Sequence, residues 1–304
     1  MEKSLLGLDR YKRKRWRKIN LWPAFFIGPH LILFTLFFII PSIFGVYVAF
    51  TKWNLFTTPK FVGLENFKII LFDKSSSFHS DFIKGLKNTI LFVILSVPFC
   101  IFVPLLMAAG LYTKPKMKNL FQVIFYLPSI FTVSAVMIIW QYLLSVSYGI
   151  LNNYFHFSIN MLGTQPYAWI SLVLVTVWWT IGGNMVIYLA ALYGVPKDLL
   201  EAAELDGANA INKFFKVMLP NIKYPLLFTV VMTTIAQFNI YGQPLMLTGG
   251  GPYDSTRVLL MYIQQYAFGK GVSIAGMASA MAIMLGICIM IVSIFQFKLL
   301  KEKE

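Results

Sequence analysis

A compact set of charges lies between two long apolar runs near the middle of the chain. The runs 169–193 and 224–247 contain no charged residue. The short segment between them holds four acids and four lysines: Asp198, Glu201, Glu204, Asp206, Lys197, Lys213, Lys216 and Lys223. Carboxylates accept hydrogen bonds and lysines donate them. The pattern therefore predicts a surface in the water phase that a partner protein grips.

The spacing in this segment predicts a helix, a turn and a second helix. Pro196 suits a helix N-terminus, so residues 197–206 are expected to be helical. Gly207 then breaks the helix, and Asn209 can cap a second helix that runs to about residue 218. That second helix carries an apolar stripe at i, i+3, i+4 and i+7, which suits a hydrophobic cleft in a partner: Ile211, Phe214, Phe215 and Met218.

The composition places this segment in a membrane protein. Hydrophobic residues make up 58% of the 304 residues, charged residues make up 12%, and the mean hydropathy is +0.70. A soluble domain carries about twice that share of charge, and a helix needs roughly 20 apolar residues to span the hydrocarbon. Six stretches qualify, which predicts an all-α membrane protein with six transmembrane helices: 21–50, 88–111, 120–143, 169–193, 224–247 and 273–297.

The distribution of Lys and Arg predicts the orientation. Of the 26 Lys and Arg residues, 18 lie on the side that holds both chain ends and the 194–223 segment. Basic residues stay on the cytoplasmic side, so both termini and this segment are expected in the cytoplasm. The predicted organisation is a basic N-terminal segment (1–20), a six-helix membrane domain (21–300) that includes the 194–223 loop, and a short tail (301–304). Anionic lipid, rather than nucleic acid, is the expected partner of the basic N-terminus.

The 194–223 segment resembles the EAA loop of permease subunits in binding-protein-dependent ABC importers. That pattern reads E-A-A, three residues, G, nine residues, I-x-L-P. Here Glu201-Ala202-Ala203 is followed by Gly207 and by Val217-Met218-Leu219-Pro220, with Val217 in the usual isoleucine position. The six spans and the turn Thr248–Pro252 are similar to those of carbohydrate permeases, such as the maltose, glycerol-3-phosphate and oligosaccharide permeases. The resemblance covers about residues 20–300 and implies the type I importer permease fold.

The resemblance also implies partners and a bacterial cytoplasmic (inner) membrane location. The expected partners are a second homologous permease, a cytoplasmic ATPase dimer and an extracytoplasmic solute-binding protein that delivers a sugar. ATP and Mg²⁺ would be bound by the ATPase, and no cofactor or catalytic residue is expected here, because the chain has no G-x-x-x-x-G-K-[ST] motif. The residues expected to couple to the ATPase are Glu201, Ala202, Ala203, Asp206, Gly207, Leu219 and Pro220.

Polar positions on two spans match the sugar-lining positions of the maltose permease. They recur at helical spacing, and an aromatic ring with amide and hydroxyl groups beside it suits a sugar. The predicted substrate-binding residues are Thr176, Trp179, Thr180, Gly183, Thr233, Gln237, Ile240 and Asn239. Thr and Asn in a span can instead bridge helices, and this alternative stays open for each of them.

Other functions are possible from the sequence alone. An ABC permease for glycerol-3-phosphate or another small solute shares the EAA loop, although no span carries an Arg or Lys for an anionic cargo. A proton- or sodium-coupled secondary transporter would usually need a carboxylate within a span, and none is present. A membrane scaffold without transport activity is the third class. Cys100 and Cys288 both fall inside spans, and no metal-ligand spacing is seen.

Overall fold

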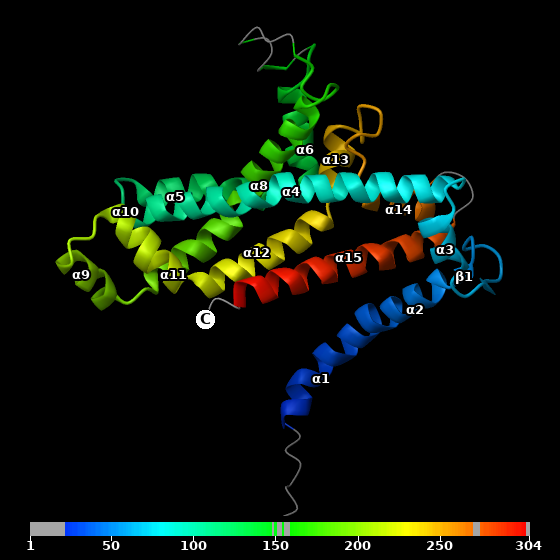
Figure 1. The fold of residues 1–304 in the computed structure, drawn as a ribbon, viewed down its shortest axis with the longest axis horizontal. Coiled ribbons are helices and arrows are strands. Elements are labelled where there is room, and N and C mark those ends of the chain that lie inside the picture. Colours follow the sequence, from blue (N-terminus) through cyan, green and yellow to red (C-terminus); the bar gives the residue numbers. More distant parts are fainter. Residues whose placement is uncertain (1–21, 148, 151–153, 155–158, 270–273, 302–304) are drawn as a thin grey trace, which may run out of the picture. The chain divides into compact units, whose positions relative to one another are not determined.

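The fold is a set of long apolar helices, described here from a computed structural model (Figure 1). The structure describes residues 22–147, 149–150, 154, 159–269 and 274–301, so the predicted N-terminal segment 1–20 and part of the predicted tail lie outside it. The chain divides into two compact units, residues 1–47 and 48–304.

The first unit is the predicted first span. It is helical from Trp22 onward, as α1 (Trp22–Phe34), a π-helical turn η1 (Thr35–Ile39) and α2 (Ile40–Ala49). Its apolar side chains remain exposed, as expected for a helix that meets lipid or another subunit.

The second unit is built around α4 and α8, which lie side by side and run in the same direction. The rings of Phe92 and Trp169 pair near one end, and those of Tyr112 and Tyr193 pair near the other. The elements before α9 are β1 (Thr51–Lys52), β2 (Lys60–Phe61), α3 (Glu65–Phe72), α4 (Ser77–Tyr112), α5 (Lys118–Tyr126), η2 (Leu127–Ile130), α6 (Val133–Leu143) and α8 (Tyr167–Tyr193). The later elements are α9 (Lys197–Leu205), α10 (Ala210–Lys213), η3 (Phe214–Met218), α11 (Leu219–Asn221), α12 (Lys223–Phe238), α13 (Gly242–Leu247), α14 (Leu259–Phe268) and α15 (Ala275–Lys301).

Three apolar clusters hold this unit together along α4. One joins α4 to α3, α14 and α15, and a second joins it to α6, α8 and α13. The third joins the C-terminal half of α4 to α8 and to the segment after α9. In Figure 1, α9 lies at one end of this unit, and β1 and α3 lie at the other.

The all-α membrane fold predicted from the sequence is confirmed, with one difference in the spans. Within the described residues, four helices are long and apolar enough to cross a membrane, or up to six if each bent pair forms one span. The run 120–143 is not one straight helix, because the chain bends by 101° between η2 and α6, where Thr132 caps α6 with its side chain.

The run 224–247 is also interrupted. The helix α12 ends at Phe238, and α13 starts only at Gly242. Pro244 lies within α13 and cannot donate a backbone hydrogen bond back to residue 240, so a continuous helix is disfavoured there. Hydropathy alone did not reveal either break, because the residues at both breaks are uncharged.

Candidate functional site

The predicted helix–turn–helix of the 194–223 segment is present, and Gly207 makes its turn. At the end of α9, the amide of Gly207 donates to the carbonyl of Glu204 (3.0 Å), and the amide of Ala208 donates to the carbonyl of Ala203 (2.9 Å). This is the Schellman arrangement, which needs a left-handed residue just after the helix. Gly207 supplies it with φ of +79°. The last Ala of the E-A-A triplet and the glycine are therefore parts of one helix cap.

The second helix begins as predicted and is tied back to the first. The side-chain oxygen of Asn209 accepts from the amide of Asn212 (2.8 Å), which is an N-cap. Lys213 on α10 forms an ion pair with Glu204 on α9 (2.5 Å). The helix continues through the π-helical turn η3 into α11, past the predicted end near residue 218. The ion pair is partly exposed, so the cap and the packing below contribute more to the geometry.

One face of this loop is anchored to the membrane helices. Leu200, Phe214 and Leu219 pack against buried residues of α4 and α8, among which Met218 and Ile222 are also inserted. Below them, the hydroxyl groups of Tyr188 on α8 and Thr229 on α12 are hydrogen-bonded (2.5 Å). A force applied to this loop therefore acts directly on α4, α8 and α12.

The opposite face of the loop exposes apolar side chains. Leu205 is 91% exposed, and Ile211 and Phe215 are also exposed. The predicted four-residue stripe is thus divided: Ile211 and Phe215 face outward, whereas Phe214 packs inward and Met218 is buried. The π-helical turn explains the division, because it rotates residues out of the 3.6-residue register. We define Leu205, Ile211 and Phe215 as the exposed coupling patch.

The remaining predicted coupling residues surround this patch. Glu201, Ala202, Asp206 and Pro220 are exposed, whereas Ala203 and Leu219 are half-buried. The arrangement offers apolar contacts with carboxylates at the edge, which suits a cleft in a soluble protein. No item of chemistry in this loop suggests catalysis; it is a docking surface.

Several predicted substrate-binding residues lie inside the helix packing. Thr176, Thr233 and Ile240 are buried, and Gln237 is only 4% exposed. Asn184 donates to the carbonyl of Cys100 and to the hydroxyl of Thr233 (both 3.0 Å), which links α8 to α4 and α12. The hydroxyl of Thr180 donates to the carbonyl of Thr176 (2.8 Å) within α8. In this conformation these groups bridge helices, and their role in binding substrate stays a prediction.

The other predicted positions are more accessible. Gly183 and Asn239 are exposed, and Trp179 is half-buried with its indole N–H donating to the carbonyl of Phe131 (3.1 Å). The substrate set therefore divides into a buried group between helices and an accessible group of Trp179, Gly183 and Asn239. The accessible group is the better candidate for contact with cargo.

We predict that Asn184→Ala destabilises the subunit and leaves cargo affinity unchanged. The change removes two hydrogen bonds between helices, each worth about 0.6 kcal/mol in membrane proteins, so Tm should fall by about 2–4 °C. Thermal unfolding in detergent and the KM for uptake measure the two effects. Asn239→Ala is the matched control, because Asn239 donates only to Ile235 in its own helix. A raised KM with an unchanged Tm for Asn184→Ala would instead indicate direct contact with cargo.

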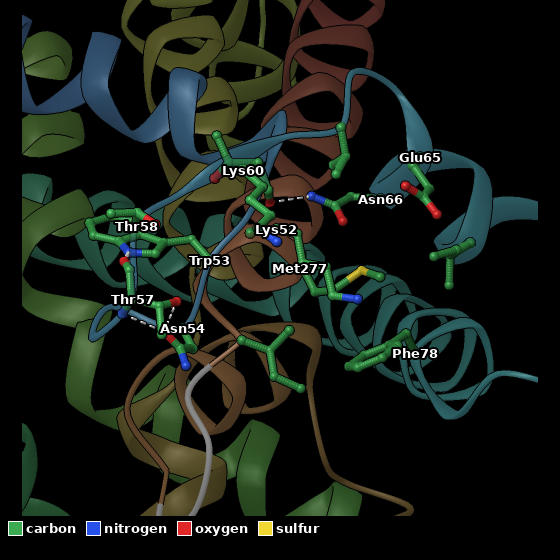
Figure 2. A pocket seen from close by; sticks show the side chains of 15 residues that line it. Lys52, Trp53, Asn54, Thr57, Thr58, Lys60, Glu65, Asn66, Phe78 and Met277 are labelled. Carbon is green, nitrogen blue, oxygen red and sulfur yellow. Dashed lines mark hydrogen bonds between the residues drawn. The ribbon is translucent and has the colours of Figure 1, made fainter.

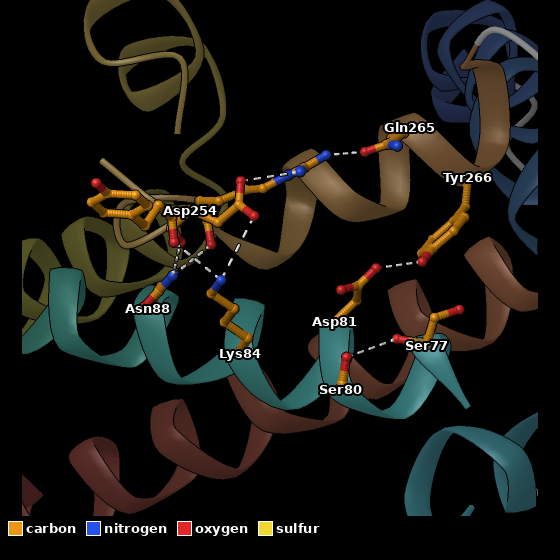
Figure 3. A network of polar contacts seen from close by, with 10 residues as sticks. Ser77, Ser80, Asp81, Lys84, Asn88, Asp254, Gln265 and Tyr266 are labelled. Atoms are coloured by element: carbon orange, nitrogen blue, oxygen red, sulfur yellow. Dashed lines mark hydrogen bonds and ion pairs between the residues drawn. The ribbon is translucent and has the colours of Figure 1, made fainter. Parts of the chain in front are cut away.

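A polar network that the sequence analysis missed holds the loop after α13 against α4 (Figure 3). Asn88 donates to the carbonyls of Asp254 (3.0 Å) and Arg257 (2.9 Å). Lys84 donates to the carbonyl of Tyr253 (3.2 Å) and lies 3.6 Å from the carboxylate of Asp254. The signal was present in the sequence, because Asp81, Lys84 and Asn88 lie at i, i+3 and i+7 on one helix face. The predicted start of the span at residue 88 concealed it, since α4 in fact begins at Ser77.

The same network reaches α14 through Asp81. The hydroxyl of Tyr266 donates to the Asp81 carboxylate. Burial and this hydrogen bond raise the pKa of Tyr266 above its usual range, and burial raises the pKa of Tyr262 to about 12. Both hydroxyls therefore remain protonated at neutral pH, and the Tyr266 hydroxyl stays a donor to Asp81.

The fold and this loop define a class: a helical membrane protein with a docking loop anchored to its spans. The model of a family described as "Binding-protein-dependent transport system inner membrane component" matches residues 75–302. The chain therefore belongs to this family, as the EAA loop predicted. It is an inner membrane component of a transport system.

Relatives along nearly the whole chain agree with this membership. The chain is 34% identical to the probable ABC transporter permease protein YesP of Bacillus subtilis, over 96% of this chain and 94% of that protein. It is 30% identical to the multiple sugar-binding transport system permease protein MsmF of Streptococcus mutans, over 93% of this chain and 96% of that one. These similarities confirm the predicted ABC permease.

The fold is also similar to that of a solved transporter. A chain of a bacterial alginate ABC transporter, in complex with an alginate pentasaccharide-bound periplasmic protein, matches with a TM-score of 0.76 and 21% identity. The match covers 91% of this chain and 93% of that chain. The predicted importer permease fold is thereby confirmed.

Proposed function

We propose that this chain forms half of the pathway through which an ABC importer carries a sugar, most plausibly an oligosaccharide, into a bacterial cell. The observation that carries the proposal is the docking loop: one face is packed onto α4 and α8, and the other presents the exposed coupling patch. Such a loop transmits force from a soluble motor to the spans. The chain itself would not be an enzyme.

The proposed partners follow from this geometry. A cytoplasmic ATPase dimer would receive the coupling patch, and a second, homologous permease would complete the pathway. Both chain termini and the loop 194–223 would lie in the cytoplasm, because most Lys and Arg residues fall on that side. A solute-binding protein would deliver cargo at the opposite end of α4.

The printed names of several relatives support a saccharide cargo. One relative is a probable starch degradation products permease, AmyD of Thermoanaerobacterium thermosulfurigenes, and another is the arabinooligosaccharides permease AraP of Halalkalibacterium halodurans. The glycerol-3-phosphate permease UgpA of Agrobacterium fabrum, at 26% identity, supports a second candidate cargo. The five runs after the first span contain no Arg or Lys to bind a phosphate, which favours the neutral sugar.

The turn after α13 is the proposed contact for the solute-binding protein. Tyr253 and Asp254 both have left-handed backbones, with φ of +51° and +57°, although neither is glycine. Such backbone strain persists only where the surroundings impose it, and Lys84 and Asn88 do so by binding the carbonyls of Tyr253 and Asp254. The result is a tyrosine that is 98% exposed on a firmly held turn. Tyrosines displayed in this way are frequent anchors of protein interfaces.

We predict that Tyr253→Ala weakens docking of the binding protein by about tenfold or more, the loss typical of an interface anchor. The measurement is ATPase activity of the reconstituted importer against binding-protein concentration. Basal ATPase activity should not change. Tyr253→Phe is the matched control, because it keeps the ring. Tyr253→Gly removes the ring and relieves the backbone, so an effect as large as that of Tyr253→Ala would show that the ring itself is needed.

Reconstituted uptake tests the proposed function. The importer, assembled with its ATPase, second permease and binding protein in liposomes that contain ATP, should accumulate a radiolabelled oligosaccharide against a gradient. A panel of malto-, arabino- and galacto-oligosaccharides, monosaccharides and glycerol-3-phosphate would define the cargo. Preferred uptake of glycerol-3-phosphate would favour the second candidate. Concentrative uptake by this chain alone, without the ATPase, would exclude an ABC mechanism.

A further inference from the structure

A pocket of about 860 Å³ opens at the end of the second unit opposite α9. It lies where the β1–β2 hairpin meets α3 and the first turns of α4 and α15. Figure 2 shows Trp53 and the two lysines of the hairpin at this pocket, with Phe78 from α4 and Met277 from α15. The volume is in the range of small-molecule sites, roughly 300–1,000 Å³. None of the functions argued above uses it.

The rim of the pocket carries an uncompensated pair of positive charges. Lys52 and Lys60 are directly opposite each other in the antiparallel β1–β2 pair. Like charges in this position destabilise a strand pair. Across the part of the chain that the structure describes, neither lysine has an ion-pair partner within 4.0 Å, and Glu65 is the one acid that lines the pocket. An anion between the two ammonium groups would remove the repulsion.

The floor of the pocket is apolar. Ile69, Phe78 and Met277 line it, and α15 closes it by packing tightly on the hairpin. A side chain at Gly276 would place its Cβ 1.9 Å from the carbonyl oxygen of Thr51, so only glycine permits this approach. Asn66 holds the same corner by donating to the carbonyls of Ala49 (2.8 Å) and Thr51 (2.9 Å). The site therefore suits a ligand with an anionic group and an adjoining apolar part.

The surroundings place the pocket at the membrane–water boundary. The hairpin and α3 expose large apolar side chains: Phe56 is 86% exposed, and Phe61, Leu64 and Phe72 are also exposed. A loop in water rarely exposes so many. The apolar span α15 starts beside the pocket at Ala275, and Trp53 and the lysines are residues typical of the headgroup layer.

We propose that this pocket binds the headgroup of an anionic phospholipid in the leaflet away from the docking loop. The phosphodiester would lie between Lys52 and Lys60. The glycerol backbone and the first acyl carbons would cover Ile69, Phe78 and Met277. The carboxylate of Glu65 would accept a hydrogen bond from a hydroxyl-bearing headgroup, which favours phosphatidylglycerol over phosphatidylcholine. The proposal does not depend on the cargo of the transporter.

Lipid retention by the purified subunit tests this site. Native mass spectrometry would compare bound phosphatidylglycerol and phosphatidylcholine in wild type and in Lys52→Gln/Lys60→Gln. Since each basic residue near an anionic surface contributes about tenfold or slightly less, the double variant should bind phosphatidylglycerol about 30-fold more weakly. Lys68→Gln/Lys74→Gln is the matched control, because both lysines are exposed near α3 but do not line the pocket. This control should bind as wild type does.

Further arms separate the lipid from other ligands. Lys52→Arg/Lys60→Arg keeps the charge and should retain the lipid, so a failure of the Gln variant through misfolding can be recognised. Met277→Trp fills the floor and should displace the lipid. If inorganic phosphate at millimolar concentration stabilises the subunit as much as phosphatidylglycerol does, the site is a free-anion site and the proposal is wrong. Equal lipid retention by wild type and the Gln variant, with weaker binding-protein docking in the variant, would assign the hairpin to a protein contact instead.

Discussion

Replacing Gly207 by proline should reduce ATP-driven uptake to below a tenth of the wild-type rate while the subunit still reaches the membrane. Gly207 has φ of +79° and donates its amide to the carbonyl of Glu204. Proline fixes φ near −65° and has no amide hydrogen, so the Schellman cap at the end of α9 cannot form. The coupling patch would then lose its fixed position relative to α4 and α8. Uptake and ATPase activity, measured in the same liposomes, should become uncoupled.

Graded substitutions at this position separate the backbone from other causes. A Cβ at residue 207 would meet no atom within 4 Å, so a steric clash is excluded and only the backbone conformation matters. A left-handed non-glycine residue costs about 1–3 kcal/mol, and asparagine tolerates this conformation better than other residues. Uptake should therefore decrease in the order glycine, asparagine, alanine, proline. Full coupled uptake by Gly207→Pro would contradict the role of the turn.

The local sequence predicted this loop accurately because short-range interactions determine its shape. Gly207 and Asn209 each fix a helix terminus through the two or three residues beside it, and the helices end and start where these residues require. The identity of the spans was also predictable, because the membrane imposes length and apolarity on each of them.

The substrate-facing side was harder to predict because it depends on how helices pack. Gln237 and Asn239 are two residues apart on similar spacing patterns, yet Gln237 is buried and Asn239 is exposed. Only the positions of α4 and α8 decide this difference, and hydropathy does not contain them. The bends at Thr132 and after Phe238 were missed for the same reason. A break with uncharged residues leaves the average hydropathy unchanged.

The two ends of α4 have different kinds of attachment. At the Tyr112 end, apolar packing joins α4 to the docking loop. At the Ser77 end, hydrogen bonds and ion pairs from Asp81, Lys84 and Asn88 join it to the turn that displays Tyr253. One continuous helix of 36 residues thus connects the proposed ATPase contact to the proposed binding-protein contact. Movement of the docking loop and the state of the displayed turn should therefore be coupled.

Replacing Leu205 by aspartate should prevent stable association with the ATPase subunit. Leu205 is 91% exposed at the end of α9, where it makes little contribution to the fold of this chain. A buried apolar anchor at an interface contributes about 2 kcal/mol or more, and a charge in an apolar cleft adds a desolvation cost. Together these effects predict at least a 30-fold loss of affinity. Co-purification of the ATPase and the ATP-dependent uptake rate measure it.

Two variants define what the Leu205 result means. Leu205→Met keeps an apolar side chain of similar size and should retain association and uptake. Asn212→Asp adds the same charge to the exposed surface of α10 without removing an apolar group, so a large loss there would indicate that net charge, rather than the apolar contact, controls docking. The thermal stability of Leu205→Asp should equal that of wild type, because Leu205 is not part of the packed cluster below the loop. Undiminished ATPase binding by Leu205→Asp would place the motor contact elsewhere on the chain.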